Sequence, residues 1–171
     1  MGILYTKTIE RNIAMNKINY RSLAICILIP LAIGGLSALF TVGSMKDFAA
    51  LRQPPLSPPG WIFPVVWTVL FVLMGVASYT VLETPTDDEA KKRAFKSYFL
   101  QLGFNFMWSI IFFSFGAYEI AFAWLLVLLA LIIITTLRFL RINKVTAILM
   151  LPYIAWVAFA GYLNLAIAYL N

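Results

Sequence analysis

The sequence predicts an all-α integral membrane protein, on the grounds of its composition, the length of its apolar runs and the placement of its charges. Of the 171 residues, 63% are hydrophobic and 12% are charged, which leaves too few charges to cover a soluble domain of this size. The apolar residues form runs close to the ~20 residues that a helix needs to cross a ~30 Å hydrocarbon core. We therefore predict a bundle of five transmembrane helices, spanning residues 22–43, 61–82, 97–115, 120–140 and 145–169.

The basic residues predict the orientation of this bundle. Five spans place 11 of the 13 Lys and Arg residues on one side: Lys7, Arg11, Lys17, Arg21, Lys91, Lys92, Arg93, Lys96, Arg138, Arg141 and Lys144. Lys46 and Arg52 fall on the other. By the positive-inside rule the N-terminus is cytoplasmic and the C-terminus outside. Residues 1–20 would then be a cytoplasmic extension of a bundle over 21–171. This asymmetry of charge fits a bacterial plasma membrane. We attribute the net charge of +6 to the orientation of the chain in the membrane rather than to a nucleic-acid site.

The connections predict how the helices begin and turn. Short turns after spans three and four make neighbouring helices antiparallel. The third helix should start before its span, in the cytoplasm, because Thr86 and Glu89 have the spacing of a capping box. Pro30 and Pro152 lie inside spans one and five. Each removes a backbone hydrogen bond and can kink its helix, which opens space in a bundle.

The outer connection, residues 44–60, is the long one. It contains the start of "RQPPLSPPGWIFPVVW", residues 52–67. Its four prolines, Pro54, Pro55, Pro58 and Pro59, fix φ and give a stiff, extended segment. Two interpretations remain open at this point: a structural linker, or a lid ordered over a cavity.

The membrane-spanning segments exclude several kinds of chemistry. No Asp, Glu, Lys or Arg lies near the centre of a span, and the chain has no histidine. Ion-coupled transport normally uses such intramembrane charges, while Ser–His hydrolysis and His-ligated metals need histidine. The single cysteine, Cys26, allows no intrachain disulfide. Any site must be built from aromatic, amide and hydroxyl groups, and we expect neither a metal nor an obligatory cofactor.

Such groups recur at helical spacing in three spans. The stripes are Trp67, Phe71, Met74 and Ser78; Gln101, Asn105, Trp108 and Phe112; and Trp156, Ala160, Leu163, Asn164 and Ile167. Amides in hydrocarbon need partners, so these faces should point into the bundle. The residues alone leave two interpretations: ordinary packing with amides joining the helices, or an apolar cavity with a few polar anchors.

Three segments resemble the signatures of the tryptophan-rich sensory protein family, TspO/MBR, which includes the mitochondrial translocator protein or peripheral benzodiazepine receptor. They are "PPLSPPGWIFPVVWTVLFVLMGVASY", "QLGFNFMWSIIFF" and "PYIAWVAFAGYLN", and the resemblance covers about residues 25–170. It implies a five-helix bundle, commonly a homodimer, that binds tetrapyrroles such as protoporphyrin IX. Some members of the family also bind cholesterol or benzodiazepine-type ligands.

The resemblance also implies a site. The family's ligand-binding positions fall on Trp67, Phe71, Asn105, Trp108, Trp156, Ala160, Leu163 and Asn164, and the proline-rich segment corresponds to the loop that closes over the pocket. The chain departs from the family at Leu56 and Phe106, where tryptophan is frequent. Leu165 follows Asn164 where cholesterol-binding members have tyrosine and then a basic residue, which argues against cholesterol binding at this end.

Three functions follow as expectations. The first is a membrane receptor or sensor that binds protoporphyrin IX and benzodiazepine-type lipophiles. The second is a light- and oxygen-dependent enzyme that degrades porphyrin, with Trp67 and Trp156 as the reactive residues. The third is a transporter of porphyrin or other lipophiles, for which the chain offers no internal repeat and no coupling-ion site.

Overall fold

The structure is a computed structural model that describes residues 18–44, 48 and 50–171. Residues 1–17, which make up most of the predicted cytoplasmic extension, lie outside the described residues, as do Lys46 and part of the outer connection. In the described part of the chain the secondary structure is entirely helical, as predicted.

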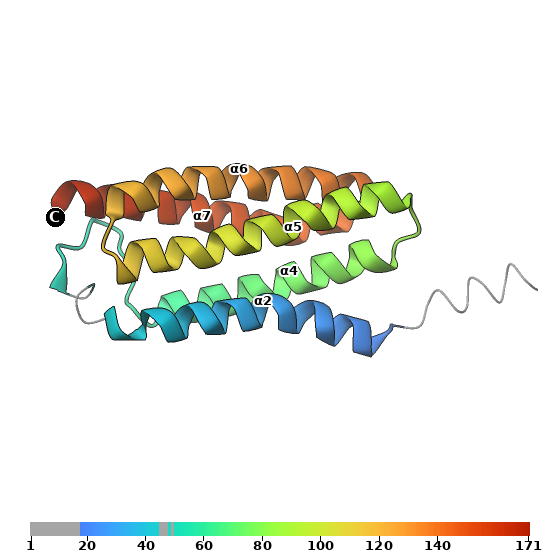
Figure 1. Cartoon of the computed structure of the whole chain (residues 1–171), viewed down its shortest axis with the longest axis horizontal. Coiled ribbons are helices and arrows are strands. Elements are labelled where there is room, and N and C mark those ends of the chain that lie inside the picture. Colours follow the sequence, from blue (N-terminus) through green and yellow to red (C-terminus); the bar gives the residue numbers. More distant parts are fainter. Residues whose placement is uncertain (1–17, 45–47, 49) are drawn as a thin grey trace, which may run out of the picture.

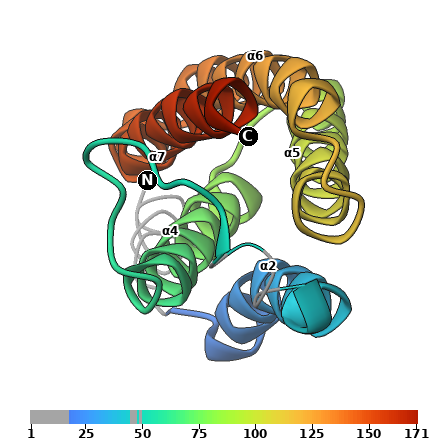
Figure 2. The ribbon, with the colours of Figure 1, turned by 90° about the vertical axis from the view of Figure 1, so that its left-hand side faces the viewer.

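Five long helices run side by side along the length of the molecule (Figure 1). They are α2 (Tyr20–Thr41), α4 (Ile62–Glu83), α5 (Asp88–Ser109), α6 (Tyr118–Ile142) and α7 (Lys144–Leu170). Seen from the end that holds the C-terminus, they form a ring in the order α2, α4, α7, α6 and α5 (Figure 2). The ring brings the first and third helices of the chain together, and likewise the second and fifth.

Four helical segments are long and apolar enough to cross a membrane: Tyr20–Ser44, Ile62–Glu83, Tyr118–Ile142 and Lys144–Leu170. The fifth helix, α5, is not among them, because it begins with "DEAKKR" and carries amide side chains further along. It is 22 residues long, as α2 and α4 are, and it lies in the ring between α2 and α6 (Figure 2).

Helix α5 begins before its predicted span, but its cap differs from the prediction by one residue. The N-cap is Asp87 rather than Thr86, and its carboxylate accepts a hydrogen bond of 2.9 Å from the Ala90 amide. The ion pair of this turn joins Lys92 to Glu89 at 2.8 Å, three residues apart. Both side chains are more than 60% exposed, so the pair contributes little to stability.

Close packing of α2 on α4 depends on a glycine. A Cβ atom built on Gly75 would lie 2.8 Å from the carbonyl oxygen of Cys26 and would also overlap the backbone of Ile27. Because backbone atoms cannot move aside as a side-chain tip can, only glycine permits this approach of the two helices. The contact fixes the wall that α2 and α4 together form around the interior.

Candidate functional site

A cavity of about 470 Å³ lies between α2, α4, α5 and α7 at the end of the bundle that carries the outer connection. Its volume falls within the ~300–1,000 Å³ typical of small-molecule sites. The lining side chains that belong to described residues are uncharged. They are Leu31, Gly34, Gly35, Ser37, Ala38, Thr41, Val42, Phe48, Ser57, Gly60, Phe63, Pro64, Trp67, Thr68, Phe71, Asn105, Trp108, Ser109, Phe112, Phe113, Ala160, Leu163, Asn164 and Ile167.

The structure brings seven of the eight predicted ligand-binding residues together around this cavity. They come from three helices: Trp67 and Phe71 from α4, Asn105 and Trp108 from α5, and Ala160, Leu163 and Asn164 from α7. The spacing of three and four residues within each helix turns these side chains to one face. The ring arrangement then points the three faces at a common interior.

Aromatic rings form a continuous wall on the α4 and α5 sides. The Trp67 ring stacks on Phe71, with centroids 5.6 Å apart, and lies 6.3 Å from the Trp108 ring. Trp108 stacks in turn on Phe112 at 5.5 Å. Offset stacking of this kind favours flat, aromatic ligands, since one more ring extends the same arrangement.

The predicted amides do hold helices together, and two of them, Asn105 and Asn164, also line the cavity. Trp108 Nε1 donates to Asn164 Oδ1 at 3.2 Å, and Asn164 Nδ2 donates to the Tyr118 carbonyl at 2.7 Å. Asn105 Nδ2 donates to Tyr153 Oη at 3.0 Å, and that hydroxyl donates to Gln101 Oε1 at 2.8 Å. The two interpretations drawn from the sequence, packing and pocket, are therefore compatible.

A turn of π-helix widens α5 beside the cavity. Ile110–Ser114 follows Ser109 with π-type hydrogen bonding, and the Phe115 amide donates to the Ile110 carbonyl at 3.1 Å. This turn places Phe112 and Phe113 on the cavity lining. Such turns occur often at functional sites, and no feature of the sequence analysis anticipated this one.

Helix α2 supplies a fourth wall that the sequence analysis missed. Gly34, Ser37 and Thr41 line the cavity, yet small residues in a long apolar helix give no periodic signal. Gly34 has no side chain, and this leaves room for the Phe71 ring, since a Cβ atom at Gly34 would overlap that ring. Ser37 is 7% exposed, and its hydroxyl has no hydrogen-bond partner within the described part of the chain.

The outer connection folds over the cavity end of the bundle, but its prolines do not line the cavity. Phe48, Ser57 and Gly60 do so instead. Pro54 is buried, whereas Pro55 and Pro59 are exposed and Pro58 is partly so. The prolines shape the segment: the Ser57 amide donates to the Pro54 carbonyl at 3.2 Å, closing a turn in which Leu56 has a φ of 67°.

Residues 50–60 of this connection, here called the lid, are fastened to α7. Tyr162 Oη donates to the Pro55 carbonyl at 3.0 Å. The Arg52 amide donates to Asn171 Oδ1 at 2.9 Å, and Asn171 Nδ2 donates back to the Arg52 carbonyl at 3.3 Å. Helix α7 thus contributes both a cavity wall and the fastening of the lid.

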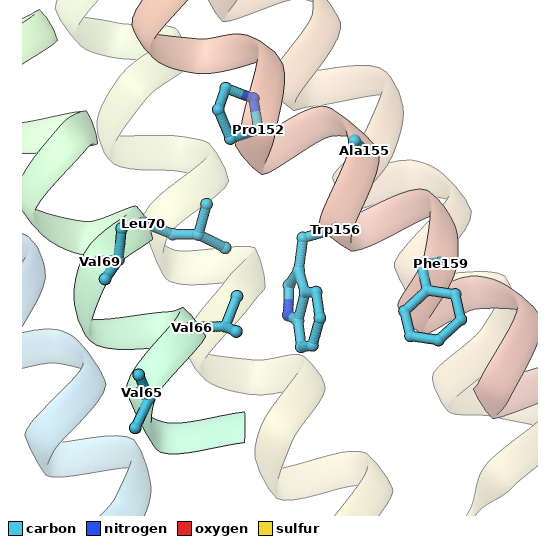
Figure 3. A pocket seen from close by; sticks show the side chains of 8 residues that line it. All are labelled: Val65, Val66, Val69, Leu70, Pro152, Ala155, Trp156 and Phe159. Carbon is cyan, nitrogen blue, oxygen red and sulfur yellow. The ribbon is translucent and has the colours of Figure 1, made fainter. Parts of the chain in front are cut away.

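Trp156 is the predicted site residue that the structure places elsewhere. It lies in a second, outward-facing groove between α4 and α7, with a volume of about 490 Å³ (Figure 3). The groove is lined by Val65, Val66, Val69, Leu70, Pro152, Ala155, Trp156 and Phe159. The interior at this level is already occupied by Tyr153, which is fully buried and packs edge-on against Trp67 at 6.2 Å. Trp156 therefore lies at the boundary of α7 with α4.

Among the described residues, no three His, Cys, Asp or Glu side chains gather in a way that could hold a metal ion. The groups that line the cavity are aromatic rings, aliphatic side chains, two amides and a few hydroxyls. This set can bind a flat lipophile by stacking and orient it by hydrogen bonds. It offers no general acid or base.

Comparisons with known proteins agree with the resemblance noted from the sequence. A profile of the TspO/MBR family matches residues 26–170. The chain is 36% identical to the tryptophan-rich protein TspO of Chlorobaculum tepidum over 163 residues, covering 92% of this chain and 99% of that protein. It is 35% identical to the protein of the same name from Archaeoglobus fulgidus, covering 90% and 99%. It is 32% identical to the translocator protein of Bos taurus, covering 80% and 82%.

Proposed function

Because the chain belongs to the TspO/MBR family, and because the described lining of its cavity is aromatic and uncharged, we propose that it is a membrane receptor for flat lipophilic ligands. Protoporphyrin IX is the proposed ligand, and benzodiazepine-type compounds fit the same chemistry. The observation that supports this most directly is the aromatic wall that Trp67, Phe71 and Trp108 form on the cavity lining.

The placement of charge suggests how a porphyrin would be oriented. The two propionate groups of protoporphyrin IX are anionic, and the described cavity lining has no cation to pair with them. Burying an unpaired carboxylate is unfavourable. The described part of the lid carries a basic side chain at Arg52. The propionates would therefore lie at the lid end, and the hydrophobic ring system beside Trp67.

The orientation in the membrane is part of the same proposal. In the described residues, the start of α2, the α4–α5 connection and the α6–α7 connection lie at the end of the bundle opposite the lid (Figure 1). The positive-inside rule places this basic end in the cytoplasm and the lid outside. Helix α5 would then be a fifth span, sheltered between α2 and α6. We propose the plasma membrane of a bacterium and a homodimeric assembly.

The test is a titration of purified full-length protein with protoporphyrin IX in the dark, followed by the absorbance of the porphyrin. The absorbance change of the porphyrin should reach saturation with the wild-type protein. Trp67→Phe should bind at least about fivefold more weakly, since it removes stacking area worth ~1 kcal/mol. Trp124→Phe is the matched control, because Trp124 stacks on Phe104 away from the cavity. Absorbance changes that never saturate, or equal losses in both variants, would refute the receptor assignment.

A second candidate function is light- and oxygen-dependent degradation of the bound porphyrin. The observation that favours it is the 6.3 Å separation of the Trp67 and Trp108 rings, both on the cavity lining, because oxidisable indoles would then border a photoexcited ligand. Illumination of the titrated samples tests it. A new absorbing product that requires oxygen and disappears in Trp67→Phe supports an enzyme. The same product from free tryptophan in detergent indicates incidental photochemistry.

A further inference from the structure

The outward-facing groove between α4 and α7 lies on the other side of a thin wall from the cavity. Phe63 lines the cavity, and Trp156 lines the groove. Their rings meet edge to face, with centroids 5.9 Å apart. On α4, Trp67 faces the cavity while the adjacent Val66 faces the groove. Where Phe63 meets Trp156, side chains rather than a helix backbone therefore separate the ligand cavity from the outward-facing groove.

Trp156 is held in an unfavourable position in this wall. Its indole nitrogen is buried and has no hydrogen-bond partner in the described part of the chain. Figure 3 shows the ring between the two helices, with the nitrogen edge towards Val66. Leaving a buried N–H unpaired costs free energy, and there is no water in the hydrocarbon region to satisfy it. A ligand that carries an acceptor would remove this cost by drawing the indole towards it.

The helix that carries Trp156 is also weakened at this level. Pro152 lies one turn earlier in α7 and lines the same groove. Because proline has no amide hydrogen, the carbonyl of Ile148 loses its usual helical partner. A helix with a missing bond tilts and bends more easily than an unbroken one. The wall thus combines an unsatisfied side chain with a deformable backbone.

In the described residues, hydrogen bonds hold the lid over its end of the cavity. The lid is fastened to α7 through Tyr162 and through the paired contacts between Arg52 and Asn171. A lipophilic ligand is concentrated in the bilayer, where it would meet the apolar α4/α7 groove directly. Passage through the lid would instead require it to leave the bilayer for water.

We propose that the α4/α7 groove is a membrane-facing binding site for flat lipophiles that carry a hydrogen-bond acceptor, and that they enter the cavity from it, with Trp156 as the movable wall. This inference rests on the proposed function, since it concerns how the same ligand reaches the same cavity. It also gives Trp156 a role in spite of its position outside the cavity lining.

The test measures rates as well as affinity. Full-length protein in lipid nanodiscs is mixed with protoporphyrin IX, and association and dissociation are followed by porphyrin absorbance. Val69→Trp fills the groove, and Val127→Trp makes the same change on the outer surface of α6, where the native valine is similarly exposed (53% and 48%). Val69→Trp should slow both rates about tenfold, and Val127→Trp should stay within about twofold of wild type.

Two further variants keep the test decisive if Val69→Trp does not fold. Ala155→Phe fills the groove from α7, with Ala130→Phe on α6 as its control, and it should also slow both rates. Trp156→Ala removes the indole from the wall and should accelerate both association and dissociation. Equal rates in the groove variants and their controls would overturn the inference about the groove but would not contradict the proposed receptor function. Faster association in Tyr162→Phe, without slowing in the groove variants, would identify the lid as the entrance. Wild type that does not bind saturably would overturn both proposals.

Discussion

Trp108 and Asn164 join α5 to α7 across the cavity wall, with the indole Nε1 donating to the amide Oδ1 at 3.2 Å. The other end of the same amide donates to the Tyr118 carbonyl at the start of α6. One buried side chain therefore connects three helices. The arrangement also orients the Trp108 ring, because the hydrogen bond fixes the edge while Phe112 supports the face.

Trp108→Phe should lower the free energy of unfolding by about 0.6–1.7 kcal/mol, the range of interhelical hydrogen bonds in membrane proteins. The variant keeps an aromatic ring but leaves Asn164 Oδ1 without its donor. Reversible unfolding in mixed micelles measures the change. A double-mutant cycle with Asn164→Leu should show coupling between the two positions. The corresponding cycle of Asn164→Leu with Trp124→Phe should show none, because Trp124 donates to the Phe104 carbonyl instead.

Gly34→Ala should weaken ligand binding by about tenfold or more, whereas Gly103→Ala, away from the cavity lining, should leave it nearly unchanged. A methyl group at Gly34 would overlap the Phe71 ring and displace it, but one at Gly103 meets no atom within 4 Å. A displaced Phe71 ring disturbs the stacking surface of the cavity. Protoporphyrin titrations of the two variants provide the comparison. Equal affinities would mean that the ligand does not occupy the space between α2 and Phe71.

The sequence was sufficient to predict the five helices and seven of the residues that line the cavity, because both depend on regular spacing. Stripes of three- and four-residue steps identified Trp67, Phe71, Asn105 and Trp108, and a ring of helices necessarily turns such stripes inward. The family resemblance was needed to choose between packing and pocket, since both produce the same stripe.

Other features of the site depend on relationships that no spacing reveals. The stripe on α7 includes Trp156, but Tyr153 fills the interior at that level and the larger indole lies against α4. Gly34 and Ser37 carry no apolar periodicity and matter only because α4 faces them. The π-helical turn at Ile110–Ser114 follows α5, and its residues include no proline or glycine that would predict it.

Gly75→Ala should destabilise the bundle by about 1–3 kcal/mol, the usual cost of overpacking. The added methyl group would meet the backbone of Cys26 and Ile27, so α2 and α4 must separate. Gly103→Ala is the control, because it lies in a helix with no atom within 4 Å of the new Cβ. That change should stabilise the protein slightly through helix propensity. Thermal unfolding of both variants tests the difference, and a Gly75→Ala protein as stable as wild type would contradict the close approach.

Tyr162→Phe should loosen the lid without disturbing the bundle. The variant removes the hydrogen bond to the Pro55 carbonyl, which is worth about 1 kcal/mol and corresponds to roughly fivefold faster exchange of lid amides. Hydrogen exchange of the segment around Pro55 and Ser57, read by mass spectrometry, is the measurement. Tyr169→Phe on the same helix serves as control, since Tyr169 is 92% exposed. Equal exchange in the two variants would show that the Arg52–Asn171 contacts are enough to hold the lid.

Leu56→Asn should make the lid more rigid. Leu56 is the third residue of the turn closed by Pro54 and Ser57, and its φ of 67° is the positive value that a type II turn requires there. An ordinary L-residue adopts this conformation at a cost of roughly 1–2 kcal/mol, which asparagine tolerates better. Leu56 is 80% exposed, so the change sacrifices little packing. Slower hydrogen exchange of the lid amides is the expected result. Leu56→Val, whose branched side chain suits this conformation least, should exchange faster than wild type, and the opposite order would show that Leu56 does not hold a positive φ in the membrane.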